Sequence, residues 1–69
     1  MTTMFTSTAG ASTREWVRAT ERRMYDAEVA LHIARQSHVD TWIAAAAERL
    51  HMAIVENRVA VAHLQAQGA

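Results

Sequence analysis

From Ala11 to Gln67 the chain contains neither proline nor glycine, the two residues that most often interrupt regular secondary structure. A long uninterrupted stretch with abundant alanine and arginine favours helix. With 69 residues, the chain is expected to form one domain with a small core. Domains of this size usually need an additional source of stability, such as disulfides, a structural metal or association with another chain. Cysteine is absent, which excludes a disulfide. We therefore predict an all-α fold stabilised by good helix packing, by a metal bound to His and carboxylate groups, or by association.

The beginning of the chain differs in composition from the rest. Residues 1–11 are rich in Thr, Ser, Ala and Gly and show no hydrophobic period, so we predict a disordered N-terminal tail. The next four residues, Ser12 to Glu15, match the S-x-x-E capping box, in which each side chain satisfies a free amide at a helix start. The pattern predicts a first helix from about Thr13, within a helical hairpin over residues 12–69.

A break between two helices is predicted at residues 36–40. Ser37 and Asp40 can both bond to local backbone amides, and Asp40 is a suitable N-cap for a second helix running from Thr41 to about Ala66. No glycine or proline enforces this break. A single continuous helix through the same residues is therefore the competing interpretation.

Both predicted helices carry a seam of residues spaced by alternating steps of three and four, as in coiled coils. The first seam is Val17, Thr20, Met24, Ala27, Leu31 and Ala34; the second is Ile43, Ala47, Leu50, Ile54, Asn57, Val61 and Leu64. A turn centred between His38 and Val39 places Thr20 opposite Asn57, where the two polar side chains can hydrogen-bond. The pattern predicts an antiparallel two-helix hairpin.

A hairpin leaves further apolar residues uncovered. The second helix has a second stripe of Met52, Val55, Val59, Ala62 and Ala66, and the first has Val29, Ala30 and Ile33 off its seam. Leaving an aliphatic side chain in water forgoes about 1.5–3 kcal/mol, and two hairpins packed as a four-helix bundle would bury both sets. We predict a homodimer with this stripe at the interface and Trp16 and Trp42 as anchors or core plugs. The alternative is that scattered exposed Val and Ala are normal on any surface.

One short motif points to a metal. Glu48 and His51 form an E-x-x-H pair, whose spacing places a carboxylate and an imidazole on one helix face, as in di-iron helical bundles. The antiparallel pairing brings Glu28 level with them. These three residues are the candidate metal ligands, and an ordinary solvated pair is the alternative.

Four arginines, Arg14, Arg18, Arg22 and Arg23, lie in the first half of the first predicted helix. Like charges at this spacing repel, and cations near a helix N-terminus oppose its dipole, so an anionic partner could compensate. Alternatively, Glu15 and Asp26 neutralise the stripe. Seven basic and seven acidic residues balance overall, which weighs against a general nucleic-acid coat.

Catalytic patterns are missing from the sequence: it has no Ser/His/Asp set, no Gly-rich phosphate loop and no carboxylate cleft. We expect no enzyme activity and no cofactor. The chain shows no secretory pattern and no span suited to a bilayer, which predicts a cytoplasmic protein without membrane contact. The expected function is a small helical adaptor or regulator that self-associates and binds another protein. A metal-binding helical bundle and a weak nucleic-acid binder through the arginine stripe are the alternatives.

Overall fold

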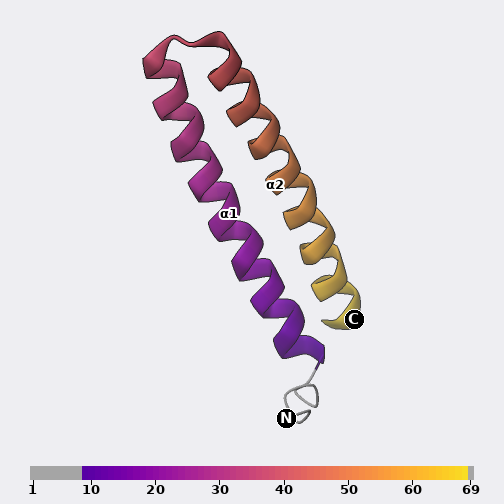
Figure 1. The fold of residues 1–69 in the computed structure, drawn as a ribbon. Coiled ribbons are helices and arrows are strands. Elements are labelled where there is room, and N and C mark those ends of the chain that lie inside the picture. Colours follow the sequence, from indigo (N-terminus) through magenta and orange to yellow (C-terminus); the bar gives the residue numbers. More distant parts are fainter. Residues whose placement is uncertain (1–8, 69) are drawn as a thin grey trace, which may run out of the picture.

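Two helices account for nearly all of the chain. The computed structural model describes residues 9–68, with side chains from Ser12 onward. Helix α1 spans Ala9–Ser37 and helix α2 spans Asp40–Gly68. Figure 1 shows the two helices side by side and antiparallel, joined by a short turn at one end. The predicted all-α hairpin is confirmed, and the single continuous helix is wrong. Within the described range, neither helix is long and apolar enough to cross a membrane.

Helix α1 begins earlier than predicted. Its first residue is Ala9, so Ser12 to Glu15 lie inside the helix and do not act as its capping box. A capping box marks the start of a helix only where the backbone before it is not helical. Here the two alanines around Gly10 favour helix, so α1 extends back beyond Ser12. Residues 9–11 of the predicted tail are thus helical, whereas residues 1–8 lie outside the described residues.

The turn is built from Ser37, His38 and Val39. The Ser37 hydroxyl donates to the carbonyl oxygen of Ala34 and accepts from the Val39 amide at 3.2 Å. The Val39 carbonyl in turn accepts from the amides of Trp42 and Ile43, each at 3.0 Å. Val39 therefore takes the N-cap position predicted for Asp40, and α2 starts one residue earlier than expected. Asp40 lies in the first turn, where a negative charge complements the helix dipole.

The turn holds the backbone of His38 in the left-handed region, with a φ of 61°. The cost of this conformation can be tested by mutation. Glycine adopts this conformation without the steric cost that other residues have there. His38→Gly should therefore raise the free energy of unfolding by about 0.5–1 kcal/mol in denaturant titrations. Gln36→Gly, inside α1, should instead lower it by about 1 kcal/mol. Loss of stability in both variants would contradict this turn geometry.

The seam of α1 is the one predicted, and the seam of α2 is confirmed in part: Ile43, Leu50 and Asn57 contact α1, whereas the positions predicted for Ala47, Ile54 and Val61 are taken by other residues. The buried residues of α2 are three alanines spaced by seven: Ala46, Ala53 and Ala60. Ala47, which the sequence placed in the seam, is exposed, and Ile54 and Val61 are half-buried at the flank. Alanine has no atoms beyond Cβ, so α1 approaches α2 more closely along the alanine row than it could over isoleucine and valine. The larger side chains then close the edge of the contact.

The core is centred near the turn end of the hairpin. Leu31, Ala34 and Ala46 form a buried cluster, and Ile43 and Leu50 pack against it. Large residues of one helix thus meet small residues of the other, which is the interdigitation that the predicted pairing requires. Because most buried side chains are alanines, the core is thin.

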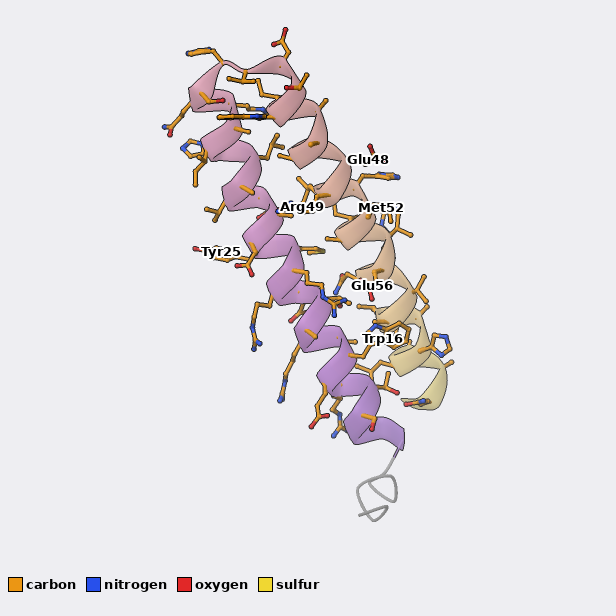
Figure 2. The ribbon with its side chains drawn as sticks, in the orientation of Figure 1. Trp16, Tyr25, Glu48, Arg49, Met52 and Glu56 are labelled. Atoms are coloured by element: carbon orange, nitrogen blue, oxygen red, sulfur yellow. The ribbon has the colours of Figure 1, made fainter. Side chains whose placement is uncertain are left out.

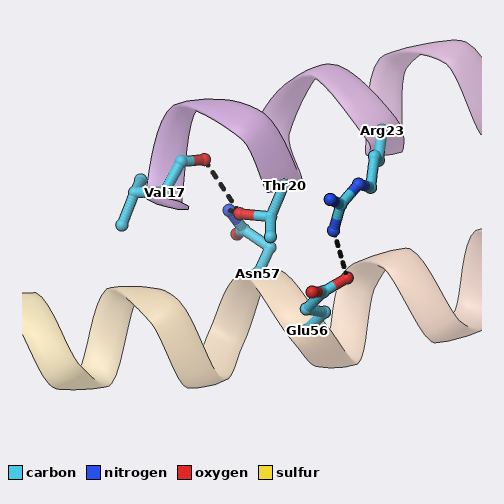
Figure 3. Close-up of polar contacts among 5 residues, drawn as sticks. All are labelled: Val17, Thr20, Arg23, Glu56 and Asn57. Carbon is cyan, nitrogen blue, oxygen red and sulfur yellow. Dashed lines mark hydrogen bonds and ion pairs between the residues drawn. The ribbon is translucent and has the colours of Figure 1, made fainter. Parts of the chain in front are cut away.

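Nearer the open end, a buried polar layer replaces apolar packing. Thr20 is fully buried, and its hydroxyl donates to the Val17 carbonyl at 2.8 Å while accepting from the Asn57 side-chain amide at 3.0 Å (Figure 3). The predicted pairing of Thr20 with Asn57 is confirmed. This polar pair in an otherwise apolar seam stabilises one register, because a slip of the helices would leave the Asn57 amide without its Thr20 acceptor.

Candidate interaction surface

One flank of the hairpin collects side chains from both helices. On α2 the residues spaced by seven, Trp42, Arg49, Glu56 and His63, share this flank with Trp16, Arg23 and Ala30 of α1. In Figure 2, Trp16, Arg49 and Glu56 lie along the line where the helices meet, whereas Tyr25 projects from the opposite edge of α1. We call this side of the molecule the groove face.

The open end of the groove face is polar. Arg23 Nη1 lies 2.7 Å from Glu56 Oε1, forming an ion pair between the helices (Figure 3). The Trp16 and His63 rings lie beside it, with centroids 5.4 Å apart and planes inclined by 52°. The hydrogen bond from Arg23 lowers the pKa of Glu56 below its ordinary value of 4.5; the Trp16 indole and the Arg23 charge act in the same direction, against desolvation.

This pKa shift predicts a pH dependence. As pH falls, the unfolded chain protonates Glu56 before the folded chain does, because the folded pKa is the lower one. The stabilisation from Arg23 and Glu56 is therefore fully present above about pH 4.5 and is lost as pH falls through the folded-state pKa. Glu56→Gln should flatten this part of the stability profile measured by denaturant titration. Arg23→Gln should flatten it equally, and an unchanged slope in both variants would contradict the pairing.

The groove face contains two neighbouring hollows, which extend towards the turn from the Arg23–Glu56 ion pair, itself part of the lining of the larger one. The larger, of about 720 Å³, has Asp26, Met52, Ala53 and Val55 among its lining residues. The smaller, of about 370 Å³, is lined by Ala30, Ile33, Ala34, Trp42, Ala45, Ala46 and Arg49. Arg49 borders both hollows. The two hollows therefore follow one another along the hairpin as parts of a single shallow groove.

Several large apolar side chains are exposed; Trp42, Met52 and Val55 line the hollows, whereas Val59 lines neither. Trp42 is 61% exposed and Met52 is 62% exposed, while Val55 and Val59 are each 45% exposed. Ala62 is exposed as well, and Trp16 is half-buried against His63. Ile33, on α1, is 58% exposed and lines the smaller hollow beside Trp42. Five of the six predicted interface residues are thus exposed in the hairpin.

Sequence reasoning missed Ala45 and Arg49 as parts of this surface, and Asp26 as a groove residue. Assigning these residues to the surface requires knowing which flank of α2 lies beside which flank of α1. That arrangement can be derived only when the seam of α2 is placed on the alanine row. A seam through Ala47 rotates the assumed contact and moves Ala45 away from it. The pattern of residues spaced by seven from Trp42 to His63 could have located the flank.

The predicted metal ligands do not come together within one copy of the chain. Glu28, Glu48 and His51 are all exposed, and no three His, Asp or Glu side chains among residues 12–68 are arranged to hold a metal ion. In Figure 2 Glu48 projects from the outer edge of α2, away from α1. The E-x-x-H pair therefore divides between the outer edge of α2, where Glu48 lies, and the larger hollow, which His51 lines, and Glu28 is not grouped with them.

The four arginines of the predicted anionic-partner site do not act together. All are exposed, and Arg23 is paired with Glu56 of α2 rather than with Glu15 or Asp26. Within the described residues, Arg14, Arg18 and Arg22 make no ion pair within 4.0 Å. The predicted neutralisation of the stripe by Glu15 and Asp26 is therefore not seen as direct pairing, and contact with an anionic partner stays a prediction.

The groove face is an open, mainly apolar surface with charged groups around it. These charged groups are Arg23, Asp26, Arg49 and Glu56. This combination of an apolar centre and a charged border is common in protein interfaces. Comparisons of the chain with protein-family models, with curated proteins and with solved structures find no match.

Proposed function

We propose that this hairpin is a non-enzymatic interaction module that works as a homodimer, with two copies packed through their groove faces into a four-helix bundle. The observation that carries the proposal is that four exposed apolar side chains, Ile33, Trp42, Met52 and Val55, line the two hollows of the groove face. Isolated exposed residues are normal, but an apolar patch with charged borders is typical of an association site.

The thin core is a second argument for association. Apart from Leu31, the buried apolar residues are all alanines: Ala27, Ala34, Ala46, Ala53 and Ala60. Each buries far less apolar surface than a leucine or a phenylalanine does, so the hairpin alone gains little hydrophobic stabilisation. Packing a second copy over Met52 and Ile33 would add the larger side chains that the core lacks.

Sedimentation equilibrium of the full chain tests the proposal. At micromolar concentration we expect a mass of twice the 7.7 kDa of the chain, and at sufficient dilution a shift towards the single mass. A folded chain that sediments at 7.7 kDa across all accessible concentrations would reject self-association. Circular dichroism at each concentration separates a folded monomer from an unfolded one.

Within this proposal, the dimer acts as an adaptor or regulator by binding another protein on the surface that the bundle leaves exposed. That role, and the cytoplasmic location, stay predictions from the sequence. Affinity capture with the dimer as bait tests the role if the captured protein is then shown to bind the purified dimer directly. A dimer that captures no protein reproducibly would leave self-association as its whole activity and contradict the adaptor role.

A further inference from the structure

The two hollows of the groove face differ in one respect that constrains how copies pair. The smaller hollow is lined by Trp42, which stands 61% exposed at its turn end. The larger hollow has the His51 imidazole in its lining but no tryptophan, tyrosine or phenylalanine, and Met52, Ala53 and Val55 give it an apolar wall. One part of the face thus offers a projecting aromatic group, and the other offers an apolar recess of about 720 Å³.

We propose that Trp42 of one copy occupies the larger hollow of a second copy, and that the second copy's Trp42 occupies the hollow of the first. This inference rests on the proposed homodimer and gives it a defined arrangement. In a dimer with two-fold symmetry, each contact occurs twice: if residue i of the first copy contacts residue j of the second, residue j of the first also contacts residue i of the second. A tryptophan in an apolar recess is also the contact that most often dominates the affinity of an interface.

The positions of the two features fix the axis. Trp42 and the middle of the larger hollow, near Ala53, are separated by about 16 Å along α2 at the helical rise per residue. A two-fold axis perpendicular to the helices, placed midway between Trp42 and the middle of the larger hollow, passes close to Arg49. Arg49 borders both hollows. The two hairpins then lie antiparallel, with their turn halves overlapping and their polar open ends extending outward.

Charge around this axis is compatible with pairing. The axis brings the two Arg49 side chains near each other. Each copy also brings the Asp26 carboxylate to the border of the larger hollow, so each arginine has a carboxylate of opposite charge in the overlapping region. The remaining charged pair, Arg23 with Glu56, is already satisfied within its own copy. Two copies can therefore approach without an unpaired excess of either sign, and Arg49 of each can reach a carboxylate of the pair.

The first experiment follows Trp42 by fluorescence in the full-length Trp16→Phe variant, where it is the remaining tryptophan. Over the concentration range in which sedimentation reports dimerisation, Trp42 emission should move to shorter wavelength and become less accessible to acrylamide. A dimer in which Trp42 stays solvent-exposed would overturn this arrangement and leave the proposed homodimer intact. A shift independent of concentration would place another part of the same chain over Trp42 and would also overturn it.

The second experiment is a double-mutant cycle between Trp42→Ala and Met52→Ala, read as the dimer dissociation constant. Trp42→Ala alone should raise that constant by about thirtyfold or more. Within one copy the two residues are about 15 Å apart along α2, so independent effects would multiply. Contact between copies predicts that the double variant is weakened by at least about threefold less than the product.

Each outcome of the cycle is decisive. A multiplicative result means that Trp42 does not contact the wall of the partner's hollow, and it overturns the inference. Absence of dimerisation in the unmodified chain overturns both this inference and the proposed function. Circular dichroism of each variant confirms that the hairpin is folded, and Ala44→Gly, outside both hollows, serves as a variant of altered helix stability without loss of interface contacts.

Discussion

Replacing Ala46 with leucine is expected to lower the free energy of unfolding by about 1–3 kcal/mol. Ala46 packs against Leu31 and Ala34, so three additional carbon atoms displace these neighbours unless the leucine turns into the smaller hollow, which Ala46 also lines. Displacing them separates the helices and weakens the neighbouring contacts. The same change at Ala60, which is fully buried, should have at least that effect. Denaturant titration at a fixed protein concentration measures both.

The matched control is Ala47→Leu, one residue along the chain. Ala47 is exposed, so its replacement should change stability by less than about 0.5 kcal/mol. The two substitutions are chemically identical and lie in the same alanine run, so helix propensity cannot distinguish them. A larger loss from Ala47→Leu than from Ala46→Leu would show that the seam of α2 runs where the sequence pattern placed it.

Substitution of Met52 by glutamate should dissociate the proposed dimer. Met52 lines the larger hollow and is 62% exposed in the single hairpin, so the hairpin itself tolerates the change. In the dimer the new carboxylate would be covered by the second copy, and an unpaired buried charge costs about 3–5 kcal/mol. We expect sedimentation of the variant at micromolar concentration to report the single-chain mass.

Ala44→Glu provides the control for added negative charge on α2. Ala44 is exposed and borders neither hollow. Its replacement should leave the dimer mass unchanged and stability within about 0.5 kcal/mol. If Met52→Glu also remained dimeric, the interface would lie away from the groove face. If both variants dissociated, the effect would come from net charge and not from the position of the substitution.

Much of the fold followed from local sequence rules. Alternating steps of three and four identified the contact side of α1 and gave the antiparallel pairing, including the bond between Thr20 and Asn57. Those features depend on periodicity and on the position of the turn, both of which are visible in one chain. Ser37 also behaved as its residue type suggests, by accepting from a backbone amide in the turn.

The errors arose where two local patterns competed. On α2, seams through Ala46 and through Ala47 both satisfy the coiled-coil spacing, and hydrophobicity favours the second because it includes Ile54 and Val61. Close approach of the helices favours the first, since it depends on how small the facing residues are. At the start of α1, the capping motif at Ser12 competed with continuation of the helix, and continuation prevailed.

The groove face could be predicted only in part. The exposed stripe of Met52, Val55 and Val59 was visible as apolar residues left over from the seam. Its partner residues on α1 and the role of Arg49 between two hollows depend on the rotation of both helices, which periodicity alone leaves uncertain by one position. The metal hypothesis was uncertain for the same reason. The E-x-x-H spacing shows that two side chains share one face of a helix, but it does not show which residues of the other helix lie near that face.

The most direct test of the central claim, that this thin hairpin is stabilised by a second copy, is its melting temperature as a function of protein concentration. A chain that folds as a dimer gains stability by mass action, so its melting temperature must rise with concentration. We predict a steady rise in the unmodified chain and little or no rise in Met52→Glu. A melting temperature that stays constant over the whole concentration range in the unmodified chain would contradict the account.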